Sequence, residues 1–411
     1  MAFTTALSGV NAAQSDLDVI SNNIANSSTT GFKTGRAEFG DVYAQSLLGT
    51  TTPTPGQGVK VTGITQQFSQ GDLEFTDNAL DVAINGDGFF QVKTTEGVVE
   101  YTRAGAFKID KDGYVSTTSG AKVQGFQVNA GSVTGEIGNI QTQTALLAPK
   151  ATTKVTLTGN LDASKGVPST GTFSATDPTS YTAVTSMAVF DSKGASHTLD
   201  VYFVKTSTAN QWDVITYVNG TNTDAGGATT PEIDQLPFTT AGAYDSTGSK
   251  GTHTLTTVAI TGAAGLVLNL DVTGMTQYGS NFAVNTAVQD GYSAGQLSSI
   301  EVNEYGLVSA RYSNGISASM GQFALADFGN VNGLQPVGST NWIETYKSGM
   351  PVLNKAGDNA LGLIQGFALE QSNVAITQEL VDLIVAQRNF QANAQVVQAE
   401  DAITQTIINM R

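Results

Sequence analysis

The sequence predicts a mainly β protein with an α-helix at each end. Three observations favour this fold class. Apolar residues recur at helical spacing near both termini, short alternating segments separated by turn residues fill most of the chain between them, and the composition changes in the middle. The 411 residues suffice for two to three domains. We therefore expect two β domains, the second inserted in the first, and N- and C-terminal helices that pack together as a coiled coil.

The N-terminal helix is predicted from an unbroken heptad pattern, in which apolar side chains occupy successive a and d positions. These residues are Phe3, Ala6, Val10, Ala13, Leu17, Ile20 and Ile24. Such a stripe also fits an ordinary amphipathic helix lying on a core. At 1.5 Å per residue, however, the expected terminal helices of about 36 and 68 Å exceed what one domain needs for packing, which favours a coiled coil.

The C-terminal segment, residues 367–411, contains no Gly or Pro and repeats the seven-residue spacing. Its seam residues are Ile376, Leu380, Leu383, Phe390, Ala394 and Val397, and beyond the polar pair Glu400 and Asp401 the apolar positions continue on a neighbouring face at Ile403 and Ile407. We predict that residues 1–24 and 367–411 form one helical coiled-coil domain. Its seam residues are the candidate polymerisation contacts.

Turn formers and alternating segments organise the chain between the first helix and the middle. Residues 25–70 are rich in polar turn formers and are interpreted as a connecting arm. Turn signals at 85–88 and 112–113 separate segments of alternating apolar residues, as in β-hairpins. Similar segments recur after the middle of the chain. We predict that residues 71–144 and 291–366 form one discontinuous β domain.

The middle of the chain differs in composition. Residues 145–290 are enriched in Thr, Ala, Ser and Gly, and they carry strand patterns of their own, for example at 199–203 and 212–217. We therefore predict that residues 145–290 form a separate outer β domain.

Composition excludes several classes of partner. Nineteen Lys and Arg against 35 Asp and Glu give a net charge of −16, which disfavours nucleic acid. No apolar run is long enough for a membrane span, so we expect no membrane insertion. The absence of Cys weakly indicates an exported protein, yet the basic and apolar segments of a cleavable signal peptide are missing from the start.

No pattern of catalytic residues is found. The sequence contains neither a Gly-x-Ser-x-Gly elbow nor a Gly-Lys pair of a phosphate-binding loop. Its two histidines, His197 and His253, are interpreted as satisfied or exposed, and 110–113 as a hairpin turn, since a calcium loop would need a later acidic ligand. Trp212 and Trp342 fit a core better than a sugar platform. We expect no enzymatic activity, no metal and no cofactor.

One motif resembles the N-terminal signature of a known family. Residues 21–33 read SNNIANSSTTGFK, and the motif positions are Ser21, Asn22, Asn23, Ile24, Ala25, Asn26, Gly31, Phe32 and Lys33. This run resembles the signature of the bacterial flagellar rod and hook family. The resemblance continues at residues 81–90, 101–113, 321–342, 361–374 and 386–390. It covers roughly residues 1–145 and 285–411.

Within that family, rod proteins are usually shorter and the first hook-associated junction protein is longer, so length and the single insert favour a hook subunit. The resemblance implies a homopolymer, a curved hollow helical tube that acts as a universal joint between rod and filament. It also implies four partners: the flagellar rod, the hook cap, the hook-associated junction protein and the type III export apparatus. The expected location is extracellular, at the hook of the flagellar basal body, after export without a cleavable signal peptide.

Two alternatives stay open from the sequence. The first is another axial protein of the same family, a distal rod component or a hook-associated junction protein. The second is a β-rich surface adhesin, which would explain the Thr and Gly content but not the paired terminal heptads.

Overall fold

A computed structural model describes most of the chain. It covers residues 2–409 apart from 43–55, 130, 143–145, 171, 223–232, 248–251, 256–259 and 261. The chain divides into two compact units, each described by itself. Unit 1 comprises Met1–Thr144, Ser299–Arg311 and Ser317–Arg411, and unit 2 comprises Ala145–Ser298 and Tyr312–Ile316.

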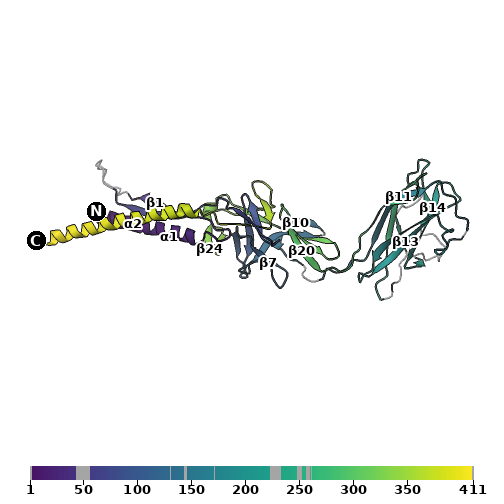
Figure 1. The fold of residues 1–411 in the computed structure, drawn as a ribbon, viewed down its shortest axis with the longest axis horizontal. Coiled ribbons are helices and arrows are strands. Elements are labelled where there is room, and N and C mark those ends of the chain that lie inside the picture. The colour runs from purple at the N-terminus through teal and green to yellow at the C-terminus, as the bar shows by residue number, and fades with distance from the viewer. Residues whose placement is uncertain are drawn as a thin grey trace. The chain divides into compact units, whose positions relative to one another are not determined.

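Unit 1 contains the two long helices, α1 (Ala2–Ala25) and α2 (Ile376–Asn409), which lie side by side (Figure 1). The fold class is therefore confirmed: the protein is mainly β with packed terminal helices. The C-terminal helix begins at Ile376, later than the expected residue 367. Phe367 has a left-handed φ of 57°, and the residues after it pair as a strand. The absence of Gly and Pro permits a helix there but does not impose one.

The expected connecting arm is partly regular. Strands β1 (Gly35–Asp41) and β2 (Val59–Gln66) pair antiparallel, with a bulge between Glu38 and Phe39. A turn-rich stretch of sequence separates these strands and hid their pairing from the sequence pattern. The arm therefore carries a β-ribbon.

The rest of unit 1 is built from short strands that precede and follow the insert in the sequence. Before the insert these are β3 (Leu73–Phe75), β4 (Val82–Asn85), β5 (Phe89–Lys93), β6 (Val99–Thr102), β7 (Phe107–Ile109), β8 (Val115–Thr117), β9 (Lys122–Asn129) and β10 (Ser132–Asn139). After it come β20 (Leu297–Val302), β21 (Leu307–Tyr312), β22 (Ser317–Phe323), β23 (Leu325–Asp327), the 3₁₀ turn η1 (Val331–Gly333), β24 (Gln335–Gly338), β25 (Asn341–Ile343), β26 (Val352–Asn354), β27 (Leu363–Gly366) and β28 (Ala368–Glu370).

Strands from the two sides of the insert pair with each other. The main sheet has the order β20-β21-β22-β9-β5-β6-β25-β24, with further strands attached at its sides. Two small sheets repeat the exchange, β4 with β27 and β3 with β28. Unit 1 therefore cannot complete its sheets without both halves of the chain. Its core includes an aromatic cluster in which Phe89 and Phe328 pack edge to face and Phe89 also contacts Trp342.

Unit 2 consists of two sheets that share one apolar core. Its strands are β11 (Lys154–Asp162), β12 (Ala183–Phe190), β13 (Ser196–Lys205), β14 (Gln211–Val218), β15 (Thr221–Asn222), β16 (Ile233–Pro237), β17 (Thr252–Thr254), β18 (Asn269–Tyr278) and β19 (Ala283–Gln289). One sheet has the order β17-β18-β11-β19, and the other has β12-β13-β14-β15 with β16 beside β14. Leu157, Phe203 and Trp212 are fully buried between side chains of both sheets.

Polar contacts join the first and last segments of unit 2. Lys150 and Tyr292 form an antiparallel bridge. The Asp290 carboxylate accepts the backbone N–H groups of Thr153 and Lys154 at 2.7 and 2.8 Å and lies 3.0 Å from the Lys150 ammonium. Although burial opposes it, these contacts lower the pKa of Asp290 below its ordinary value. The segments that enter and leave the insert are thereby fastened together.

Candidate assembly site at the terminal helices

The terminal helices are antiparallel, and two contacts fix their register. The Asn23 amide donates to the Glu379 carboxylate at 3.2 Å. Further along, a Cβ added at Gly9 would lie only 2.6 Å from the Asn393 side chain, so Gly9 allows a close approach of the helices. The two contacts are separated by the same number of residues on each helix, as an antiparallel pair of straight helices requires.

The α1 seam residues are mostly removed from solvent. Ala6, Ala13 and Ile20 are buried. Val10, Leu17 and Ile24 are half-buried, whereas Phe3 is about half exposed.

The α2 seam residues are less uniformly covered. Leu383, Phe390, Ala394 and Val397 are half-buried. Ile376, Leu380 and Ile403 are about half exposed, so they lie outside the covered face. The side chain of Ile407 lies outside the described residues.

Two α2 positions belong to the covered face although the heptad pattern did not select them. Ala386 is fully buried and Glu379 is nearly so. Glu379 was missed because it is charged, and the signal that could have found it is its spacing from Leu383 and Ala386, one and two helical turns away. Its burial is possible because the Asn23 amide satisfies one carboxylate oxygen.

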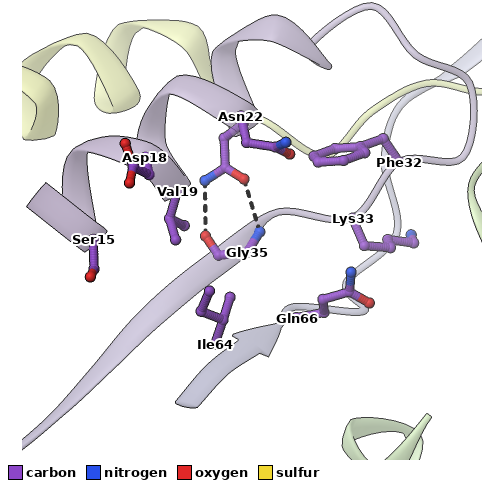
Figure 2. Close-up of a pocket in the computed structure, with 10 residues that line it drawn as sticks. Ser15, Asp18, Val19, Asn22, Phe32, Lys33, Gly35, Ile64 and Gln66 are labelled. Carbon is purple, nitrogen blue, oxygen red and sulfur yellow. Dashed lines mark hydrogen bonds between the residues drawn. The ribbon is translucent and has the colours of Figure 1, made fainter. Parts of the chain in front are cut away.

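Within the signature motif, Asn23 connects three elements of the fold. Its side chain pairs with the backbone of Gly35, accepting the N–H at 3.0 Å and donating to the carbonyl at 2.8 Å. These two bonds are the dashed lines that end at Gly35 in Figure 2, where Asn23 itself carries no label. With the Glu379 contact, one buried amide joins α1, α2 and β1. Such a fork needs both an acceptor and donors on one short side chain, which Asn supplies.

The rest of the run 21–26 ends the helix. Ser21, Asn22 and Ala25 are exposed. The Asn22 carbonyl accepts both the backbone N–H of Asn26 at 3.1 Å and the Asn26 side-chain amide at 2.9 Å. The Thr29 hydroxyl then donates to the Asn26 side chain at 3.1 Å. These contacts turn the chain from α1 toward the β domain.

Gly31 passes against the backbone of the β domain. It has a φ of 69°, and an added Cβ would lie 2.6 Å from the Ala104 nitrogen. Its N–H donates to the Glu370 carbonyl at 2.8 Å. Only a residue without a side chain fits here, which explains the glycine of the motif.

Lys33 belongs to a fully buried ion cluster. Its ammonium donates to the Glu370 carboxylate at 2.6 Å and to the Ser69 carbonyl at 2.7 Å, and both side chains of the ion pair are 0% exposed. Arg103 reaches the other carboxylate oxygen at 3.3 Å. Burial lowers the pKa of Lys33 and of Arg103, and the carboxylate between them opposes this shift. The cluster therefore ties the arm, the β domain and the segment before α2 together.

Asn373 anchors the start of α2 to the arm, as Asn23 anchors the end of α1. Its side-chain oxygen accepts the backbone N–H and the hydroxyl of Thr34, both at 2.8 Å. Its amide group donates to the carbonyls of Gln67 and Ser69 at 2.8 and 3.1 Å. Both helices are thus anchored to the arm by buried or half-buried Asn side chains.

A pocket of about 370 Å³ lies between α1 and the β-ribbon (Figure 2). Val19, Phe32 and Ile64 supply its apolar lining, and Asp18 and Gln66 its polar lining. Phe32 is half-buried and lines this open groove, so it is the motif side chain that faces the pocket.

The other polar motifs have structural explanations. Asp110 accepts the backbone N–H groups of Asp112 and Tyr114 at 2.9 and 2.8 Å, so 110–113 is the turn of the β7–β8 hairpin, as expected. His197 lies between Asp191 and Asn219 at 3.1 and 2.6 Å, and the side chain of His253 lies outside the described residues.

Neither tryptophan is available as a sugar platform, because Trp212 and Trp342 are both buried. Among the described residues, no group of three or more His, Asp or Glu could hold a metal ion. No described helix is both long and apolar enough to cross a membrane.

Comparison with known proteins identifies the family. Models of four families match: flagella basal body rod protein at 3–33, flagellar hook protein FlgE/F/G D1 domain at 83–161, flagellar basal body protein FlaE D2 domain at 160–292, and flagellar basal body rod FlgEFG protein C-terminal at 365–410. The flagellar hook proteins FlgE of Salmonella typhimurium (strain LT2) and Escherichia coli (strain K12) are 39% and 40% identical to the chain, each over 100% of both chains. This chain belongs to the flagellar hook protein FlgE family.

The FlgE family extends to distant bacteria. The flagellar hook protein FlgE of Treponema pallidum is 32% identical over 99% of this chain and 98% of its own. The crystal structure of Helicobacter pylori flagellar hook protein FlgE2 covers 72% of this chain and 100% of its own with a TM-score of 0.51, and at 16% identity it shows a shared fold. The resemblance seen in the signature motif is confirmed, and the chain is a structural subunit of the flagellar hook.

Proposed function

We propose that this hook subunit polymerises with its own copies into a curved, hollow helical tube, which acts as a universal joint between rod and filament. One observation carries the proposal. The α1–α2 pair leaves large apolar side chains about half exposed, among them Phe3 and Leu7 on α1 and Ile384, Val385 and Ile403 on α2. Apolar surface on both sides of a helix is typical of a helix with more than one neighbour.

The candidate polymerisation residues then have two roles. Those that are buried or half-buried, such as Ala13 and Phe390, stabilise the helix pair within one chain. Those that are about half exposed, Phe3, Ile376, Leu380 and Ile403, contact other copies. Because much of the apolar surface of α2 stays uncovered within one chain, the helix pair gains most of its order during assembly, when neighbours cover it.

The units have different places in the proposed tube. The terminal domain, residues 1–24 and 367–411, forms the inner wall through its helices α1 and α2. The discontinuous β domain of 71–144 and 291–366 forms the middle layer, and the insert of 145–290 lies outermost. The arm of 25–70 connects the first two. The support is the family membership together with the anchoring of both helices to the arm by Asn23 and Asn373.

The proposed partners are copies of the chain, the flagellar rod, the hook cap, the hook-associated junction protein and the type III export apparatus. The proposed location is outside the cell, after export without a cleavable signal peptide. Helices that order only on assembly suit passage through a narrow channel. No nucleic acid is expected as a partner, because the net charge is −16.

Electron microscopy of the full-length protein tests the proposal. Curved hollow tubes of one width are expected, and added salt should promote them because it screens the repulsion between chains of charge −16. Ile384→Lys on α2 should raise the critical concentration for tube formation. The control is Val267→Lys, which changes a similarly exposed aliphatic residue of unit 2 and should leave that concentration unchanged. Straight tubes would indicate a rod-type subunit, and the absence of tubes at any salt concentration would contradict self-polymerisation.

A further inference from the structure

The outward side of α2 presents an apolar face with a single cation. Successive residues of an α-helix are about 100° apart, so Arg388 projects about 200° away from Ala386, which is buried. Val381 and Ile384 lie one to two turns before Arg388 on the same side, and Leu380 flanks them. These three aliphatic side chains are 47% to 55% exposed. Together with Arg388 they are called the Arg388 face.

Arg388 is the only Lys or Arg of α1 and α2, within Ala2–Ala25 and Ile376–Asn409. Its side chain is exposed, and no ion pair among the described residues includes it. A guanidinium offers five donors in a planar fork, a geometry suited to carboxylates. The Arg388 face therefore combines apolar area with one strong, unused recognition group.

A complementary surface lies beside the Arg388 face, further round α2. A groove of about 300 Å³ runs between α1, α2 and β1, and Asp16, Glu379 and Asp382 line it. The only cationic group lining it is Arg36, which pairs with Glu38 at 2.6 Å. Burial, and after it the neighbouring carboxylates, raises the pKa of Asp16 and of Glu379. The groove thus has three lining carboxylates and one lining cation that is already paired.

Arg388 cannot compensate the groove of its own chain. Asp382 precedes Arg388 by six residues, so the two side chains project about 120° apart and start about 9 Å apart along the helix, and no ion pair joins them among the described residues. The match is therefore available only between two molecules. A patch that fits a different patch on an identical copy can repeat from copy to copy, and this heterologous geometry generates helical polymers when the rotation does not close a ring.

We propose that the Arg388 face docks on a second copy of this chain, with the Arg388 guanidinium inserted between Asp16 and Asp382 in the groove of that copy. The proposal rests on the polymerisation proposed above and names the residues that give it direction. The aliphatic side chains around Arg388 exclude water from the contact, which strengthens the charge pairing. Val385 of the second copy, which also lines the groove, offers them apolar surface.

Charge exchange in the full-length protein tests the pairing. At fixed low salt, Arg388→Glu should raise the critical concentration for tube formation at least about tenfold, because it places a carboxylate against the acidic groove. Lys108→Glu makes the same change of charge at an exposed β-domain position and should alter it less than about twofold. Asp382→Arg alone should also impair assembly. The double variant R388E/D382R should return to within about threefold of the wild type.

The controls separate the possible failures. Circular dichroism verifies that each variant keeps its fold, and R388E/D16R replaces R388E/D382R if Asp382→Arg unfolds the helix pair. If the wild type forms tubes and Arg388→Glu leaves the critical concentration unchanged, the pairing is refuted and the polymerisation is not. The same holds if neither double variant restores assembly. Equal loss of assembly in wild type and Arg388→Gln on addition of EDTA would assign the groove to a divalent cation and also overturn the pairing. If the wild type forms no tubes at any salt concentration, the underlying polymerisation is refuted instead.

Discussion

The buried ion cluster should dominate the stability of the helix anchorage, and Glu370→Gln tests this. The Glu370 carboxylate is 0% exposed. It accepts hydrogen bonds from the Lys33 ammonium at 2.6 Å, the Arg103 guanidinium at 3.3 Å and the Gly71 N–H at 3.0 Å. Glutamine keeps the shape of the side chain but removes its charge. Two cations then remain in the interior with no counter-ion.

The expected loss is large. Removing one partner of a buried ion pair costs about 3–5 kcal/mol, because the remaining charge is desolvated without compensation. Since Glu370 raises the pKa of Lys33, its loss should lower that pKa further. The folded state then binds fewer protons than the unfolded state, so the stability of the variant should rise with pH. The difference in unfolding free energy between the wild type and Glu370→Gln should therefore shrink from neutral to alkaline pH.

Urea unfolding followed by tryptophan fluorescence measures the effect. Trp342 is buried in unit 1 and Trp212 in unit 2, so Trp212→Phe in every variant leaves a reporter for unit 1. Glu74→Gln is the matched control, because Glu74 is exposed and its main partner is the Gln371 amide. If Glu370→Gln shifts the unfolding free energy no more than Glu74→Gln does, the cluster does not carry the anchorage.

Three further outcomes are expected. Gly31→Ala should lower the unfolding free energy of unit 1 in urea by about 2 kcal/mol or more, because φ is positive and the Cβ would meet Ala104; a loss under about 0.5 kcal/mol would contradict this. Asp290→Ala should lower the unfolding free energy of unit 2 by about 1–3 kcal/mol, because two backbone N–H groups lose their acceptor, and Trp212 fluorescence in urea measures the loss. Because the pKa of Asp290 is depressed, wild-type unit 2 should lose this stability as pH falls below about 4, and the variant should not. Because the pKa of Glu379 and of Asp16 is raised, amide protection of α1 and α2 should increase as pH falls from 7 through these pKa values, and an unchanged protection would count against the acidic groove.

The sequence predicted the terminal helices well because their signal is local. A heptad repeat is contained within one segment, and the packing that it implies is found between α1 and α2. The signature motif at 21–33 is equally local, and its residues alone indicate the family. What the motif does could not be derived from it. Lys33 is paired with Glu370, 337 residues away, and nothing in the local pattern connects the two.

The misjudged boundaries have similar causes. The β1–β2 ribbon joins strands separated by a turn-rich stretch, so its pairing depends on register over a distance that alternation does not report. Residues 367–375 have a helix-compatible composition, but β28 pairs with β3 and Glu370 is committed to the ion cluster. Tertiary contacts override a weak local preference in this segment.

The α2 seam carries information beyond its fit to one partner. The heptad frame predicted from the sequence and the frame of the covered face, each a set of positions that repeats every seven residues, share Leu383 and Phe390. They differ at the start of the helix, where Glu379 is covered and Ile376 and Leu380 are about half exposed. A helix with one neighbour has no reason to keep apolar residues in both frames, since exposed aliphatic side chains favour aggregation. A helix that packs first against its own chain and then against copies requires both frames. The proposed assembly therefore accounts for the ambiguity of the heptad in α2: under that proposal, the covered frame holds one subunit together and the exposed frame joins subunits.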